Sequence, residues 1–252
     1  MTGEWVLVSP QRTERPWLGH REATAGDQGM TYDPDCYLCP GNLRAGGIRN
    51  PVYTGTFAFD NDYPALVPDG DEVTRDANRH RLLRAIPEPG ICQVLCFSPR
   101  HDLTMARMTN QQITGVIHAW SKQTASLAAL PWTTYVQIFE NKGELMGCSN
   151  PHPHCQIWAS GSLPNAPAKE DECQKAHAGV EGECLLCAYT KLEMNDGIRL
   201  VCANDHFAAL VPYWAVWPFE VLVTARRHMA SFTAFEPPEI EALADLLGRL
   251  TR

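Results

Sequence analysis

The spacing of hydrophobic and polar positions predicts the main elements of the first half of the chain. Three β-rich runs are bounded by Pro, Gly or Asp, as strands usually are, at residues 5–8, 55–59 and 91–97. After Thr109, a candidate helix N-cap, apolar residues recur at helical spacing at Ile113, Val116, Ile117 and Trp120. A further strand is predicted at residues 133–139, directly after this helix.

The end of the chain predicts a second amphipathic helix. Pro237 and Pro238 can open a helix, because the first helical turn tolerates proline. Five apolar residues then share one face, at Ile240, Leu243, Leu246, Leu247 and Leu250. Short strands and amphipathic helices in this order favour an α+β fold.

A series of short motifs occurs twice, in the same order. The first copy consists of Cys36-Tyr-Leu-Cys39, Asn61-Asp62, Ala65-Leu-Val-Pro68 and Arg100-His101. The second copy consists of Cys184-Leu-Leu-Cys187, Asn204-Asp205, Ala209-Leu-Val-Pro212 and Arg227-His228. This order indicates a duplication, with domains expected at residues 1–165 and 166–252. Compared with the first half, the second stops after its helix, so we expect it to be incomplete.

Composition and charge exclude several classes of protein. The 252 residues contain 29 acidic and 21 basic side chains, for a net charge of -8. Such a chain is a poor candidate for sequence-independent nucleic-acid binding, which needs a basic surface. No apolar run approaches the ~18 residues that span a bilayer. Residues 1–5 show neither a basic leader nor an apolar segment, so we expect a cytoplasmic protein without membrane association.

The ten cysteines include two pairs with Cys-x-x-Cys spacing. In an intracellular protein this spacing is typical of a metal site or of a redox-active dithiol. We expect neither pair to follow a strand and open a helix, as a thioredoxin-like motif does, and therefore favour metal binding. The other six cysteines stand singly, and most of them are expected to be small buried apolar residues.

The chemistry of the chain concentrates around three alternating residues, His152, His154 and Gln156. If a strand begins at His154, then His154 and Gln156 point to the same face. Gly147 and Ser149, just before, offer backbone N–H groups and a hydroxyl to an anion. An imidazole beside neutral donors suits nucleophilic attack on phosphorus, and Gln156 can orient phosphate oxygens.

The run Gly147-Cys-Ser-Asn-Pro-His-Pro-His-Cys-Gln-Ile-Trp158 resembles the active-site signature of the galactose-1-phosphate uridylyltransferase family, in the histidine-triad superfamily.

 

Further motifs that match this family follow in chain order: Ser9-Pro-Gln-Arg12, Arg15-Pro-Trp17, Asp35-Cys-Tyr-Leu-Cys-Pro-Gly-Asn42, Phe59-Asp-Asn-Asp62, Phe139-Glu-Asn-Lys-Gly143 and Val211-Pro-Tyr-Trp-Ala-Val-Trp-Pro-Phe-Glu220. The resemblance implies two histidine-triad-like halves, each with an antiparallel sheet and flanking helices.

The resemblance also implies a reaction and a set of substrate-binding residues. His154 would attack the α-phosphorus of UDP-glucose, and galactose 1-phosphate would then collect UMP from the histidine in a ping-pong exchange. The expected substrate-binding residues are Arg12, Arg15, Phe59, Asn61, Asp62, Asn141, Gly147, Cys148, Ser149 and Gln156. The family implies a homodimer. Cys155 stands where the family usually has Gly, and we expect its side chain to point away from the site.

Two metal sites follow from the resemblance. Cys36, Cys39, His101 and His152 match the family's zinc ligands, and two thiolates with two imidazoles suit a closed structural site. A second site, for Zn²⁺ or Fe²⁺, is expected at Cys184, Cys187 and His228 or through Glu170.

Two alternatives remain open from the sequence. Relatives with the same His-Pro-His-x-Gln pattern include phosphorylases that transfer AMP from an ADP-sugar to phosphate. The expected incomplete second half also leaves open an inactive, zinc-stabilised fragment.

Overall fold

The computed structural model describes residues 4–9, 29–69, 80, 82–143, 146–148 and 150–252. The chain divides into two compact units that interleave along the sequence. The first unit comprises Met1–Leu103 and Gln123–Pro164, and the second comprises Thr104–Lys122 and Asn165–Arg252. The domain boundary expected between residues 165 and 166 stays a prediction.

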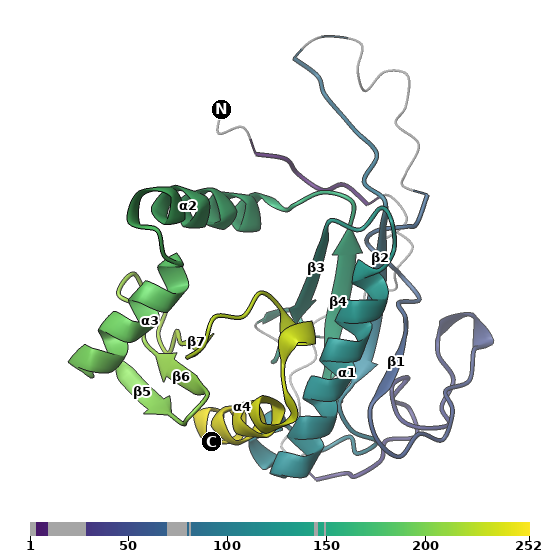
Figure 1. The fold of residues 1–252 in the computed structure, drawn as a ribbon. Helices are drawn as coiled ribbons and strands as arrows, with labels where there is room; N and C mark the ends of the chain where they lie inside the picture. Colours follow the sequence, from purple (N-terminus) through teal and green to yellow (C-terminus); the bar gives the residue numbers. More distant parts are fainter. Residues whose placement is uncertain (1–3, 10–28, 70–79, 81, 144–145, 149) are drawn as a thin grey trace. The chain divides into compact units, whose positions relative to one another are not determined.

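The first unit contains a four-stranded antiparallel sheet (Figure 1). Its strands are β1 (Phe57–Asp60), β2 (Gly90–Cys96), β3 (Tyr135–Phe139) and β4 (His154–Ser160), in the spatial order β1-β2-β4-β3. The strands expected at residues 55–59, 91–97 and 133–139 and the strand from His154 are therefore confirmed, with small shifts at their ends. A short 3-10 turn, Ala45–Gly47, precedes β1.

The strand predicted at residues 5–8 is wrong. Residues 4–9 form no strand, and Trp5, Val6, Leu7 and Val8 are all exposed. An alternating or apolar run becomes a strand only where another strand completes its backbone hydrogen bonds. None of the strands that the structure describes pairs with this segment.

Helix α1 (Asn110–Ala128) confirms the helix predicted after Thr109. The Thr109 hydroxyl accepts a hydrogen bond from the Gln112 N–H at 3.3 Å, and the Gln112 side chain accepts one from the Thr109 N–H at 2.8 Å. This reciprocal pair is a capping box, which satisfies N–H groups that a helix start leaves unpaired. Ile113 and Ile117 of the predicted apolar face are fully buried. A 3-10 turn, Met105–Arg107, precedes the helix.

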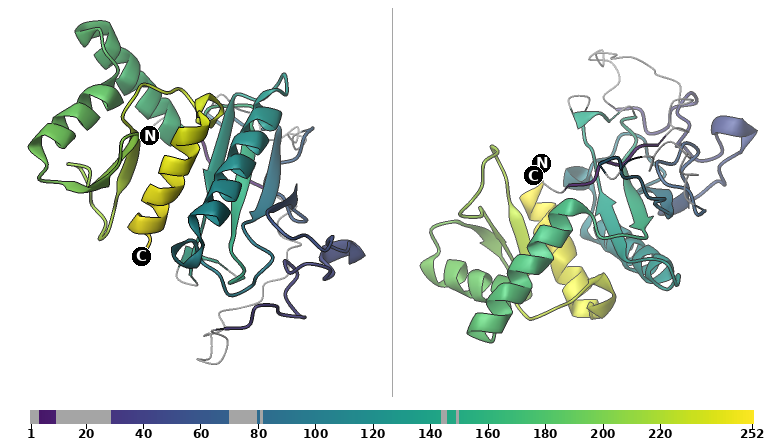
Figure 2. Two further views of the ribbon diagram at one scale, coloured as in Figure 1. Left: turned by 60° about the horizontal axis from the view of Figure 1, so that its bottom comes forward. Right: turned by 90° about the horizontal axis from the view of Figure 1, so that it is seen from above.

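The second unit contains a three-stranded antiparallel sheet, β5 (Leu200–Ala203), β6 (Phe207–Leu210) and β7 (Leu222–Ala225) (Figure 2). Its further helices are α2 (Asn165–Glu181), α3 (Leu185–Asp196) and α4 (Pro237–Leu250), with a 3-10 turn at Phe232–Ala234. Both α3 and α4 contact β6. The expected α+β class with antiparallel sheets is confirmed.

Helix α4 matches the helix predicted at the end of the chain. Ile240, Leu243 and Leu246 of its predicted apolar face are buried. The Glu239 carboxylate accepts a hydrogen bond from the Glu236 N–H at 2.8 Å and so caps the start of the helix.

The hydrophobic pattern did not predict α2 and α3. Helix α2 buries no residue, and the buried residues of α3 are polar, Thr190 and Glu193. Arg199 neutralises Glu193 through an ion pair of 2.9 Å. Gly197 ends α3 in the left-handed conformation, with φ 69°, which glycine adopts at little cost. These two helices therefore lack the apolar stripe on which the sequence pattern relies.

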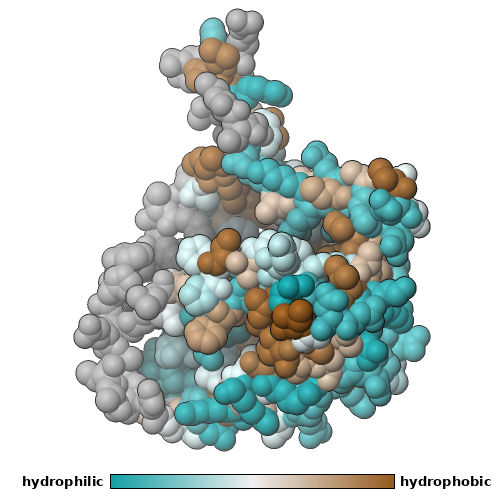
Figure 3. All heavy atoms as spheres, turned by 90° about the vertical axis from the view of Figure 1, so that its left-hand side faces the viewer, coloured by the Kyte–Doolittle hydropathy of each residue, from teal (hydrophilic) through white to brown (hydrophobic). Residues whose placement is uncertain are grey.

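Polar and apolar residues share the surface. Large exposed apolar side chains of the second unit include Ile198, Tyr213 and Trp217, and Figure 3 shows apolar residues standing among polar ones on one face of the molecule. Within the described part of the chain, no helix has both the length and the apolar character needed to cross a membrane.

Candidate active site and metal-binding clusters

Strand β4 carries His154 and Gln156 on one face and Cys155 on the other. Burial alternates along the strand, so that Cys155 and Ile157 are buried while His154 and Gln156 are partly exposed. Successive side chains of a strand point to opposite faces. The expectation that Cys155 points away from His154 is thus met, and its thiol belongs to the core on the far side.

The strand register places candidate nucleotide-binding residues on the face of His154 and Gln156. Phe57 pairs with Cys96, which pairs with His154. In the next row, Phe59 pairs with Val94, and Val94 pairs with Gln156. Directly paired residues of antiparallel strands share a face. Phe59 and Gln156 are therefore two strands apart on one surface, about 10 Å at the usual spacing between strands.

The side chains of His154 and Gln156 are oriented by nearby hydrogen bonds. His154 Nδ1 lies 2.7 Å from the backbone oxygen of His152. Because a carbonyl oxygen can only accept, Nδ1 donates, and the neutral ring carries its lone pair on Nε2. The Trp158 indole N–H donates to Gln156 Oε1 at 3.2 Å. The Gln156 amide oxygen therefore faces Trp158, and its NH2 group remains to donate hydrogen bonds.

The first metal-binding cluster consists of Cys36, Cys39, His101 and His152, all of them buried. Their candidate ligand atoms all lie within 4.8 Å of one another. Cys39 Sγ lies 3.6 Å from His101 Nδ1 and 3.5 Å from His152 Nδ1. The four residues expected as the first metal site are thus brought together, and their donor atoms could hold a metal ion.

A second layer of groups orients the ligands of the first cluster. His152 Nε2 donates to the Ser98 carbonyl at 2.9 Å, which leaves Nδ1 as the ligand atom facing Cys39. The Asn150 side chain accepts from the His152 N–H at 2.9 Å, and its amide nitrogen lies 3.4 Å from Cys36 Sγ. Burial raises the pKa of Cys39 to about 12 and lowers the pKa of His152 to about 4.

Cys184, Cys187 and His228 form a second cluster, which is less buried than the first. Cys187 Sγ lies 3.5 Å from His228 Nδ1, much as Cys39 lies relative to His101. Glu170, on an exposed part of α2, is not among the residues of this group. Within the described residues, the second cluster therefore offers three ligands.

The second Cys-x-x-Cys pair opens a helix but does not follow a strand, so it lacks the thioredoxin-like arrangement, as expected. Cys184 is the N-cap of α3, and this helix follows α2 rather than a strand. A hydrogen bond from the Cys187 backbone lowers the pKa of Cys184, whereas burial raises the pKa of Cys187. The missing apolar stripe of α3 explains why the sequence pattern did not reveal the helix.

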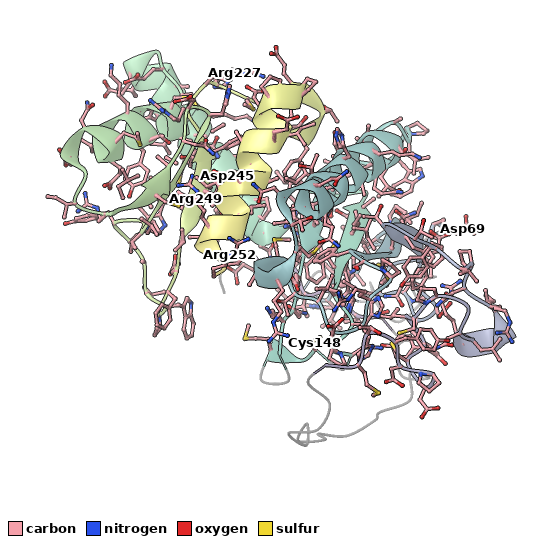
Figure 4. The ribbon with its side chains drawn as sticks, turned by 90° about the horizontal axis from the view of Figure 1, so that it is seen from below. Asp69, Cys148, Arg227, Asp245, Arg249 and Arg252 are labelled. Atoms are coloured by element: carbon pink, nitrogen blue, oxygen red, sulfur yellow. The ribbon has the colours of Figure 1, made fainter. Side chains whose placement is uncertain are left out.

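The predicted substrate-binding residues lie in two segments of the first unit. Phe59 is on β1, and Asn61 and Asp62 follow directly after it. Asn141, Gly147 and Cys148 belong to the segment between β3 and β4, where Figure 4 labels Cys148. The Cys148 thiol donates to the Asn150 carbonyl at 3.1 Å. The predicted residues Arg12, Arg15 and Ser149 lie outside the described residues.

Comparison with known families decides the identity of this fold. The model of the galactose-1-phosphate uridyl transferase N-terminal domain matches residues 1–164, and that of the C-terminal domain matches residues 168–252. The chain belongs to the galactose-1-phosphate uridyl transferase family. The resemblance read from the signature around His154 is thereby confirmed.

Individual members of the galactose-1-phosphate uridyl transferase family match nearly the whole chain. The galactose-1-phosphate uridylyltransferase of Neurospora crassa is 43% identical, over 100% of this chain and 74% of its own length. That of Rattus norvegicus is 44% identical, over 98% of this chain and 64% of its own length. A solved uridylyltransferase structure has a TM-score of 0.80 at 27% identity and covers 98% of this chain and 71% of its own. The chain thus corresponds to about two thirds to three quarters of these relatives.

An ADP-glucose phosphorylase of Arabidopsis thaliana shares the fold, with a TM-score of 0.68 at 21% identity over 96% of this chain and 71% of its own. The fold alone therefore does not distinguish the two activities, whereas the relatives that match at 43% and 44% identity are uridylyltransferases.

Sequence reasoning missed one residue at the candidate nucleotide site of this uridyl transferase family member. Arg44 lies against Phe59 and pairs with Asp62, both of which are predicted site residues. The available signal was its position five residues after Cys39 and two residues after the matching motif that ends at Asn42. An isolated arginine has no spacing pattern that would reveal a contact with a strand fifteen residues later.

Proposed function

We propose that the protein transfers UMP from UDP-glucose to galactose 1-phosphate through a covalently uridylylated His154. The observation that carries this proposal is the hydrogen bond of His154 Nδ1 to the His152 carbonyl, 2.7 Å long, on the face that also bears Gln156. It favours the tautomer whose Nε2 is nucleophilic. Family membership supplies the substrates.

Each half of the reaction exchanges one bond at phosphorus. The Nε2 lone pair attacks the α-phosphorus, a P–N bond forms, and the P–O bond to glucose 1-phosphate breaks. A phosphate oxygen of galactose 1-phosphate then attacks the same phosphorus and releases the histidine. The positive charge that develops on the ring is shared with Nδ1–H, whose bond to the His152 carbonyl is strengthened by that charge. The Gln156 amide donates to the phosphoryl oxygens, and Arg12, Arg15 and Ser149 serve the same phosphates.

Zinc fits the first cluster. With Zn–S of about 2.3 Å and Zn–N of about 2.0 Å, a tetrahedral site has sulfur and nitrogen about 3.5 Å apart. The distances from Cys39 Sγ to His101 Nδ1 and His152 Nδ1 are 3.6 and 3.5 Å. Four protein ligands close the site, so its role is structural. When bound, zinc would supply the positive charge that stabilises thiolates in this buried position.

The second cluster would hold Zn²⁺ or Fe²⁺ with three protein ligands. The distance of 3.5 Å between Cys187 Sγ and His228 Nδ1 supports this assignment. Metal analysis of the purified protein tests it, with two metal equivalents expected in the parent and one in Cys187→Ser. The exposed thiol of Cys173 provides a control, Cys173→Ser, which should keep both. An unchanged metal content in Cys187→Ser would contradict the assignment.

The covalent intermediate gives the main test of function. Radiolabelled UMP from UDP-glucose should become acid-labile label on the protein and should be absent from His154→Ala. His118→Ala, which removes an exposed histidine of α1, is the matched control and should label like the parent. Label that persists in His154→Ala would refute the nucleophile, and an unlabelled parent would favour the inactive fragment.

Nucleotide and acceptor selectivity separate the proposed transferase from an ADP-sugar phosphorylase. UDP-glucose and ADP-glucose are each offered with galactose 1-phosphate or inorganic phosphate. The proposal requires preference for UDP-glucose with galactose 1-phosphate. Preference for ADP-glucose and phosphate would replace it by the phosphorylase.

Assembly and location follow from the same proposal. The resemblance supports a homodimer, which sedimentation analysis would test, and a monomer at assay concentration would contradict it. None of the ten cysteines is in a disulfide, which is typical of a reducing compartment and supports a cytoplasmic location.

A further inference from the structure

Arg44 places a guanidinium group against the end of β1. Its side chain is only 9% exposed, and Nη1 lies 3.2 Å from Asp62 Oδ1. The guanidinium carbon lies 3.8 Å from the centre of the Phe59 ring, and Nη1 also donates to the Asp60 carbonyl at 3.4 Å. One arginine thus contacts three of the four residues from Phe59 to Asp62.

These contacts fix the two groups that would face a nucleoside. The Phe59 ring contacts both the Arg44 guanidinium and the Phe57 ring, whose centre is 5.3 Å away. Burial raises the pKa of Asp62, while Arg44 and a hydrogen bond from the Ala45 backbone lower it. A carboxylate has about four acceptor positions, so the Asp62 carboxylate can accept further hydrogen bonds from hydroxyl groups beside these two partners.

One atom of Arg44 remains unsatisfied. Its Nε is buried without a hydrogen-bond partner among the described residues. A buried polar atom without a partner costs stability, so the position of this arginine is not explained by folding alone. A role at the nucleotide site accounts for its placement.

The geometry of the sheet relates Arg44 to the reacting phosphorus. Gln156 and Phe59 lie in one row of paired residues, with Val94 between them. A nucleotide whose α-phosphate is held at Gln156 reaches β1 along this row, about 10 Å away. Its ribose then lies between the phosphate and the Phe59 region, within the reach of the Asp62 carboxylate.

We propose that Arg44 is a positioning residue that holds Asp62 for the ribose hydroxyls, and so makes the site selective for ribonucleotides over 2′-deoxyribonucleotides. The inference rests on the proposed function, because Asp62 is taken as a nucleotide-binding residue. Arg44 acts through Asp62 and Phe59 and needs no contact with the reacting atoms.

Binding of UMP and 2′-deoxy-UMP, measured by calorimetry on the full chain, tests the proposal without requiring turnover. Hydrogen bonds to charged groups lead us to expect about 10- to 100-fold tighter binding of UMP in the parent. Arg44→Gln should lose most of this ratio, whereas Arg44→Lys should keep part of it. Arg49→Gln, which removes an exposed arginine of the same loop, is the matched control and should leave the ratio unchanged.

A double-variant comparison shows whether Arg44 acts through Asp62. Asp62→Asn should lower the ratio, and adding Arg44→Gln to it should change the ratio by less than about twofold. Equal weakening of UMP and 2′-deoxy-UMP in Arg44→Gln would overturn the proposal, as would additive losses in the double variant. If Arg44→Gln does not fold, the ratio of UMP to 2′-deoxy-UMP binding in Arg44→Lys and Asp62→Asn decides instead. Both variants should lower this ratio, and an unchanged ratio in both would overturn the proposal.

The outcomes also separate this inference from the proposed function. A parent that binds UMP with the expected selectivity, and keeps it in Arg44→Gln, overturns only the role of Arg44. A parent that binds neither nucleotide and takes up no label from UDP-glucose overturns the proposed function, and the role of Arg44 with it.

Discussion

Replacement of Asn150 by alanine should weaken the first metal cluster and slow uridylyl transfer together. Asn150 is 5% exposed, and its Oδ1 accepts from the His152 N–H at 2.9 Å. Its amide nitrogen lies 3.4 Å from Cys36 Sγ. His152 is at once a predicted metal ligand and, through its carbonyl, the hydrogen-bond partner of His154. The Asn150 side chain therefore connects the candidate metal cluster to the proposed nucleophile, His154.

The magnitude follows from the groups that alanine leaves behind. The buried His152 N–H loses its partner, which costs about 1–3 kcal/mol of unfolding free energy. At about 2 kcal/mol, the melting temperature should fall by about 4–8 °C for a chain of this size. Loss of a group that orients metal ligands weakens metal affinity by about 10- to 100-fold.

Three measurements check this prediction on the same preparations. Urea unfolding gives the change in free energy, competition with a chromophoric chelator gives metal affinity, and the rate of label incorporation reports the nucleophile. Asn150→Asp keeps the acceptor for the His152 N–H but replaces the N–H near Cys36 by a negative charge. It should regain part of the stability without regaining metal affinity. Wild-type stability and metal affinity in Asn150→Ala would refute the reasoning.

Three further predictions concern packing and metal binding. Tyr53→Phe removes a hydroxyl that donates a hydrogen bond to the Leu38 carbonyl at 2.6 Å, and should lower the free energy of unfolding in urea by about 1–2 kcal/mol. Tyr135→Phe should be nearly neutral, because the hydrogen bond of its hydroxyl is exposed. Gly90→Ala should lower the free energy of unfolding by about 1–3 kcal/mol, because the new Cβ would lie 2.6 Å from the Ala159 carbonyl oxygen. Gly115 has open space around it, so Gly115→Ala should instead stabilise α1 by about 0.5–1 kcal/mol. Chelation of metal should lower the melting temperature of the parent, with recovery on adding zinc, and an unchanged melting curve would contradict a structural site.

Residues close in sequence carried most of what could be predicted. The alternation of His152, His154 and Gln156 sufficed to predict the strand and its two faces, because side-chain direction in a strand depends only on local backbone geometry. The Cys36-x-x-Cys39 spacing likewise predicted two of the four ligands of one cluster. The pairing of this segment with His101 and His152 came from family resemblance rather than from spacing.

Features that depend on tertiary contacts were harder to predict from the sequence. Residues 5–8 have the composition of a strand, but a strand needs a partner that sequence composition does not supply. Helix α3 buries Thr190 and Glu193, and Arg199 neutralises the Glu193 carboxylate. The buried face of this helix is therefore polar and shows no apolar stripe in the sequence. Arg44 contacts β1 only because the chain folds back after the Cys-x-x-Cys turn. In each case a distant partner determines the role of the residue.

The segment from His152 to Gln156 connects the candidate metal cluster to the proposed nucleophile, His154. His152 is fixed by the first cluster, and its carbonyl holds Nδ1 of His154 at 2.7 Å. Two residues further on, Gln156 is oriented by Trp158 on the same face. A nucleophile that must attack one phosphorus in line tolerates little rotation of its ring. We propose that a metal ion bound by the first cluster would restrict the backbone that carries the acceptor for that ring, and would so contribute to catalysis through position.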